Sequence, residues 1–80
     1  MHEWLLAATT RLAEASGGAP GDYVLTQAEI DDILELARVA AHESGERINA
    51  PLLSYLVGLA HGRHDGKLAD LVDAAIAKRI

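Results

Sequence analysis

Apolar residues recur every three to four positions in four segments of the chain, the spacing that places them on one face of a helix. The first segment contains, at this spacing, Trp4, Leu5, Ala8, Leu12 and Ala15. The glycine- and proline-rich stretch SGGAPG at 16–21 follows and is expected to end the helix. We therefore predict a helix over residues 3–15 with a loop behind it. Trp4 is expected to anchor this helix in the core, and the alternative is a contact with a partner.

The second segment has the best-defined start. Thr26 and Glu29 are spaced as in a capping box, in which each side chain accepts a hydrogen bond from the other residue's backbone amide. Gly45 provides a stop. The pattern predicts a helix over residues 27–43 with its acidic side chains in solvent. Its apolar stripe consists of Ile30, Ile33, Leu34, Ala37, Ala40 and Ala41.

The third segment is apolar on almost every side, which is typical of a helix at the centre of a bundle. Pro51 suits the first turn, so we place this helix over residues 51–61. Gly58 in its interior predicts a close crossing with another helix, and Gly62 is expected to end it. The apolar residues are Leu52, Leu53, Leu56, Val57, Leu59 and Ala60.

The fourth segment is amphipathic again and predicts a helix over residues 67–79. Lys78 and Arg79 suit its negative end. Its stripe consists of Leu68, Leu71, Val72, Ala75 and Ile76. Four amphipathic helices with short connections predict an all-α fold, a compact four-helix bundle-like single domain over residues 1–80.

Composition narrows the classes of function. The 80 residues carry a net charge of −5, whereas a nucleic-acid backbone is bound by clustered lysine and arginine, so we expect no nucleic-acid partner. No apolar run reaches the roughly 18 residues of a membrane span, and the N-terminus does not resemble a signal peptide. The absence of cysteine excludes disulfides and thiol chemistry. We expect a cytoplasmic protein that does not bind membranes.

Candidate catalytic and metal-binding residues are sparse. The serines lie in no Gly-x-Ser-x-Gly sequence, and the carboxylates of the second helix are expected to be solvated, so we predict that the chain is not an enzyme. His61, His64 and Asp65 are the best metal ligands, but a zinc site needs three or four converging ligands and Gly62 interrupts this set. We therefore expect surface histidines at a helix end, and no bound metal or other cofactor.

The junction between the second and third helices is the best candidate for binding a partner or an anion. His42 closes one helix, Arg47 lies in the loop, Asn49 stands at the start of the next helix, and Tyr55 lies one turn further on. An arginine beside the free amides of a helix N-terminus is a natural anion site. The amides in question would be those of Leu52 and Leu53.

A structural role for the same junction is the alternative. Arg47 would then pair with a nearby carboxylate, Glu43 or Glu46. His42 would cap the last carbonyls of its own helix. The sequence leaves both interpretations open.

Several motifs along the chain resemble a known family. They are Trp4-Leu5, LARVAAH at 36–42, Arg47 and APLLSYLVGLAHGR at 50–63. Together they resemble an actinobacterial domain of unknown function that occurs alone or appended to MobA-like molybdopterin-guanine dinucleotide biosynthesis proteins. The resemblance implies an accessory role near molybdenum cofactor synthesis or insertion, and it carries over no catalytic residue.

Three hypotheses about function remain. The first is a non-enzymatic module that binds a protein partner, such as a molybdenum cofactor enzyme or biosynthesis protein, through Arg47 with His42 and Tyr55 beside it. The second is a module that binds a phosphate-bearing pterin or nucleotide at the same junction. The third is a structural homo-oligomer, in which apolar helix faces complete a core that 80 residues barely supply.

Overall fold

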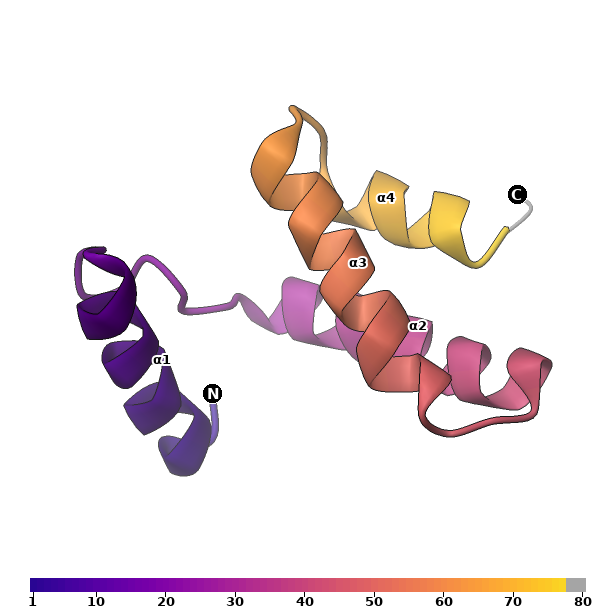
Figure 1. The fold of residues 1–80 in the computed structure, drawn as a ribbon, viewed down its shortest axis with the longest axis horizontal. Coiled ribbons are helices and arrows are strands. Elements are labelled where there is room, and N and C mark those ends of the chain that lie inside the picture. Colours follow the sequence, from indigo (N-terminus) through magenta and orange to yellow (C-terminus); the bar gives the residue numbers. More distant parts are fainter. Residues whose placement is uncertain (78–80) are drawn as a thin grey trace.

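The computed structural model of the chain describes residues 1–77. Over this range the chain is all-α, as predicted, and it contains no strand. The helices are α1 (Glu3–Ser16), α2 (Gln27–Ser44), α3 (Asn49–Arg63) and α4 (Leu68–Ala75). Figure 1 shows α3 crossing α2, with α4 beside both of them and α1 set apart.

The ends of α2 form as the sequence predicts. The amide of Glu29 donates to Thr26 Oγ1 over 3.2 Å, and the amide of Thr26 donates to Glu29 Oε1 over 2.7 Å, which completes the capping box. At the other end Gly45 takes the left-handed conformation with φ of 75°, where a side chain would be strained. The sequence therefore determines both ends of this helix locally.

The ends of α3 differ from the prediction. It begins at Asn49 instead of near Pro51, because the preceding loop is already wound: the amides of Asn49 and Ala50 donate to the carbonyls of Glu46 and Arg47. It also continues through Gly62, the expected stop, and ends at Arg63. A glycine lowers helix stability without forbidding a helical conformation, and the chain leaves the helix only at the extended His64.

The end of α4 also differs from the prediction. The helix stops at Ala75, and Ala77 has a positive φ of 51° that no helix continues through. Lys78 and Arg79, which were expected to occupy its last turn, lie outside the described residues. The helix therefore has 8 residues instead of the 13 or so that the stripe suggested.

The core lies between α2, α3 and α4, and its central cluster takes one buried residue from each: Leu36, Val57 and Val72. Four half-buried side chains surround them, namely Leu53, Leu68, Leu71 and Ile76. Gly58 does not mark a close crossing, because a Cβ atom built there would meet nothing within 4 Å. The prediction of tight packing at Gly58 is therefore wrong.

Helix α1 packs against none of the other three helices. Trp4 is 69% exposed, so the prediction that it anchors the core is wrong. The radius of gyration is 13.3 Å, whereas a compact domain of this length has about 12 Å. The sequence pattern identified α1 as an amphipathic helix, but the pattern alone does not determine which surface covers it.

Candidate functional site

The α2–α3 junction brings two of the predicted site residues together. His42 lies in the last turn of α2, and Arg47 lies in the loop before α3. Both line a shallow hollow of about 430 Å³, together with Arg38, Ala41 and Gly45. The sequence analysis did not include Arg38, although its position one helical turn before His42 could have indicated it.

The other two predicted site residues lie elsewhere. Asn49 lines a separate groove and does not take part in the hollow. Tyr55 lines neither of them, and 68% of its surface is exposed on α3. The four residues therefore do not form one enclosed site.

Arg38 and Arg47 have different surroundings. Arg38 makes a forked contact with Glu35, through Nε at 3.0 Å and Nη2 at 2.7 Å, and this hydrogen bonding raises the pKa of Arg38. Within residues 1–77, by contrast, no carboxylate forms an ion pair with Arg47. The structural alternative, in which Glu43 or Glu46 holds Arg47, is therefore not observed in the described part of the chain. Of the two arginines in this hollow, Arg47 is therefore the one whose guanidinium is available to an outside group.

The backbone half of the predicted anion site fits the structure only in part. Because α3 begins at Asn49, the amide of Leu53 lies inside the helix, whereas Leu52 is the fourth residue, and the first four amides of a helix have no partner within it. The amides of Asn49 and Ala50 already donate to carbonyls of the preceding turn, at 3.2 and 3.1 Å. An anion at this junction would therefore be bound mainly by side chains.

His61, His64 and Asp65 follow one another around the end of α3. His61 is the third residue from the end of the helix, and His64 follows its last residue in an extended conformation. In the part of the chain that the structure describes, no three metal-ligating side chains are grouped closely enough to hold an ion. These residues thus have no third partner among the described ones.

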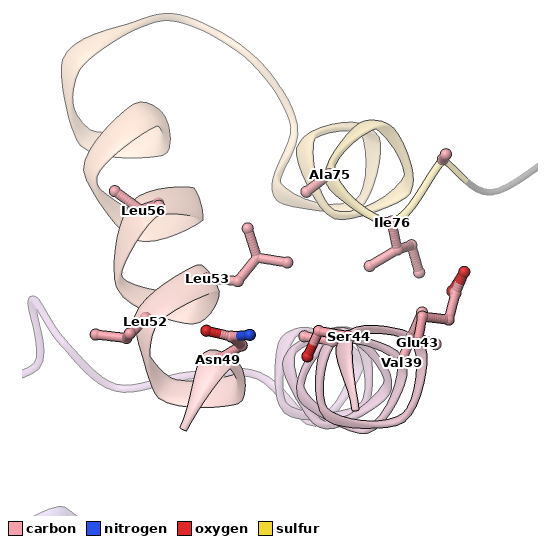
Figure 2. A pocket seen from close by; sticks show the side chains of 11 residues that line it. Val39, Glu43, Ser44, Asn49, Leu52, Leu53, Leu56, Ala75 and Ile76 are labelled. Carbon is pink, nitrogen blue, oxygen red and sulfur yellow. The ribbon is translucent and has the colours of Figure 1, made fainter. Parts of the chain in front are cut away.

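An apolar groove between α2, α3 and α4 is the feature that sequence analysis missed. Its volume is about 540 Å³, and its main side chains are Val39, Leu52, Leu53, Leu56 and Ile76. Figure 2 shows Leu53 and Ile76 reaching into the space between the three helices. The sequence did contain a sign of this groove, because α3 is apolar on more sides than two neighbouring helices can cover.

The chain was compared with known protein families, proteins and structures. A family described as "Domain of unknown function (DUF6457)" matches residues 1–80. The chain belongs to the DUF6457 family. No curated protein and no solved structure matches this DUF6457 chain. None of its described helices combines the length and apolar character needed to cross a bilayer.

Proposed function

We propose that this DUF6457 chain is a non-enzymatic module that binds a protein partner at the α2–α3 junction. The proposed contact, which we call the junction surface, consists of His42, Arg47, Ile48 and Tyr55. The observation that carries the proposal is that Arg47, which forms no ion pair within residues 1–77, is followed by Ile48, 65% exposed, and further along α3 by Tyr55, 68% exposed.

This combination has the character of an interaction surface. Arginine and tyrosine are enriched among the residues that dominate binding energy at protein interfaces. Ile48 and Tyr55 are seven residues apart, so they lie on the same side of α3. A guanidinium fork binds a carboxylate through two parallel hydrogen bonds. A matching partner therefore presents a carboxylate next to an apolar depression.

The pKa shifts of Glu29 and Arg38 need no catalytic explanation. Hydrogen bonds on the surface of α2 explain both shifts. Hydrogen bonding with Thr26 lowers the pKa of Glu29, and hydrogen bonding with Glu35 raises that of Arg38. These hydrogen bonds belong to the start of α2 and to an exposed ion pair on the same helix, so the two shifts have a structural cause.

The partner that we propose is a protein of molybdenum cofactor synthesis or insertion, encountered in the cytoplasm. This choice comes from the resemblance of the Ala41-His42, Arg47 and Ala50–Gly62 motifs to the domain appended to MobA-like proteins. In such an arrangement the module would hold an enzyme near its cofactor source and would not itself react.

The test is a parallel affinity capture with the wild-type chain, Arg47→Ala and Arg63→Ala. Arg63 is an exposed arginine at the opposite end of α3, so Arg63→Ala is a matched control for the loss of one positive charge. We expect wild type and Arg63→Ala to retain the same molybdenum cofactor protein and Arg47→Ala to lose it, with all three equally helical by circular dichroism. Equal retention by Arg47→Ala contradicts the proposal, and so does unfolding of that variant.

A phosphate-bearing small ligand is the second candidate for the same junction. The observation in its favour is that Arg38, His42 and Arg47 line one hollow. Titration with pterin and nucleotide phosphates should then shift the amide resonances of residues 38–47 in NMR spectra. Unchanged resonances at millimolar phosphate exclude this candidate.

A further inference from the structure

We propose that α1 of one copy docks into the apolar groove of a second copy, and that the exchange is reciprocal, giving a homodimer. The interface would bring the stripe formed by Trp4, Leu5 and Leu12 against the groove residues Leu52 and Leu56. Each chain has one such stripe and one such groove, so two copies cover all four surfaces.

The exposed area of the chain supports this dimer. The chain exposes 6151 Å², whereas a compact monomer of its 8.5 kDa exposes about 4,700 Å². The excess is more than about 1,000 Å² per chain. Two chains that cover it bury more than about 2,000 Å² in total, which lies in the range of obligate homodimers.

Helix α1 exposes an apolar stripe of the kind that another helix usually covers. Trp4 is 69% exposed, Leu12 52% and Leu5 38%, and Ala8 lies between them on the same face. Exposed single apolar residues are common, but a stripe that includes the only tryptophan marks an interaction surface. Nothing in residues 1–77 packs α1 against another helix.

The segment between α1 and α2 supports a second copy as the occupant, in preference to the same chain. Gly18 donates to the carbonyl of Ala13 over 2.8 Å, and Ser16 Oγ and Tyr23 Oη lie 3.2 Å apart. At the other end of α1 the amide of Leu25 donates to Met1 Sδ over 3.2 Å. The segment therefore runs back along α1 and holds it away from its own groove. Because the segment is held to α1 as far as Leu25 and α2 begins at Gln27, little chain is left to carry α1 onto its own groove with these contacts intact, whereas docking onto a second copy keeps them.

Charge also favours α1 as the occupant of the groove. The chain has a net charge of −5, and α1 contributes two glutamates and one arginine to it, so stacking two copies through α2–α4 would bring acidic surfaces together. Arg11 lies seven residues from Trp4, on the same side of α1. Glu43 is an acidic member of the groove and can receive it.

The dimer and the proposed junction surface use different residues. Of the residues of that surface, none lines the apolar groove. The Arg47→Ala variant is therefore expected to remain dimeric even if it loses its partner, so each proposal can fail without the other.

The first measurement is sedimentation of the wild-type chain over a dilution series, with Trp4 fluorescence recorded on the same samples. Trp4 is the only tryptophan, so its emission reports on α1 alone. We expect a dimer with blue-shifted emission that converts on dilution to a monomer with red-shifted emission. A monomer with blue-shifted emission at every concentration overturns the proposal, because α1 then docks within its own chain. A monomer with red-shifted emission overturns it in favour of a different protein as occupant.

Variants on the two surfaces make the test specific. Leu12→Asp puts a charge in the stripe of α1, and Thr10→Asp puts the same charge on the opposite face of the helix as a matched control. Leu56→Asp puts a charge in the groove at a side chain that is 55% exposed, so α2–α4 should stay folded. Leu12→Asp and Leu56→Asp should be monomeric, with at least a tenfold weaker association, and Thr10→Asp should be dimeric.

Mixing the two monomeric variants identifies the contact. The intact α1 of Leu56→Asp can dock into the intact groove of Leu12→Asp, so a mixture should form heterodimers that neither variant forms with itself. Dimers of Leu12→Asp alone, or a mixture that stays monomeric although both variants are folded, would refute the exchange of α1.

Discussion

At the scale of single residues, the ionisation of Glu29 should make the stability of the start of α2 depend on pH. Its carboxylate accepts the Thr26 amide, which lowers the pKa of Glu29 in the folded chain relative to 4.5. A carboxyl group with a lowered folded-state pKa stabilises the fold fully above its unfolded pKa, and this stabilisation disappears as the pH falls through the folded value. We expect the wild-type chain to lose stability in acid partly through this group.

The Glu29→Gln variant tests this prediction, because its amide can still accept the hydrogen bond but does not titrate. Urea unfolding followed from neutral pH to below 4.5 should show a weaker pH dependence for Glu29→Gln than for wild type. Glu46→Gln, in the loop behind α2, is the matched control and should keep the wild-type dependence, because only backbone groups of Glu46 form hydrogen bonds. Identical acid profiles for wild type and Glu29→Gln would rule out this role of Glu29.

Residue patterns in the sequence predicted local interactions well and distant ones poorly. The contact of Thr26 with Glu29 depends on three intervening residues, so the sequence specifies it. His42 and Arg47 line the same hollow, since the end of one helix and a short loop connect them. The exposure of Trp4 was not predictable, because the periodicity that makes it face one side of α1 is the same for a buried and an uncovered helix.

At the scale of the helices, two glycines should respond in opposite directions to alanine. Gly45 ends α2 with φ of 75°, where a Cβ atom is strained even though nothing surrounds it. Gly45→Ala should therefore cost about 1 kcal/mol of unfolding free energy. Gly58 lies inside α3 with nothing within 4 Å of an added Cβ atom, so Gly58→Ala should stabilise by up to about 1 kcal/mol.

Urea midpoints of the two variants measured against wild type decide this prediction, and each variant is the control for the other. A destabilising Gly58→Ala would show that some group packs closely on α3 at this position, as the sequence had suggested. A neutral Gly45→Ala would mean that α2 ends without the left-handed conformation.

The existence of each helix could be predicted from the sequence. The end of a helix could be predicted only where a nearby residue, such as a glycine, terminates it. Gly17 and Gly45 both end their helices in the left-handed conformation at the predicted positions. The start of α3 was missed because the preceding loop is held by carbonyls of Glu46 and Arg47, an arrangement without a sequence signature. The groove was missed for a related reason: the leucines of α3 were assigned to a four-helix core, but α1 does not contribute to it.

At the scale of the whole molecule, the amount of buried surface is the limiting quantity. Only Ala13, Leu36, Ala40, Val57 and Val72 are buried hydrophobic residues in the described part of the chain. A core of this size leaves little margin over the conformational entropy lost on folding. A fourth helix in the groove would cover Leu52 and Leu56, each of which is more than half exposed. The stability of the chain and its association should therefore be coupled.

This coupling predicts that the thermal midpoint depends on protein concentration. If two folded chains bind each other and unfolded chains do not, mass action raises the midpoint as the concentration increases. Thermal unfolding recorded by circular dichroism over a hundredfold concentration range should show this rise for wild type and for Thr10→Asp. Leu12→Asp should unfold at a lower temperature that does not change with concentration, because its α1 cannot dock. A wild-type midpoint that stays constant over the same range would mean that α2–α4 are stable without a second copy, and the coupling would be disproved.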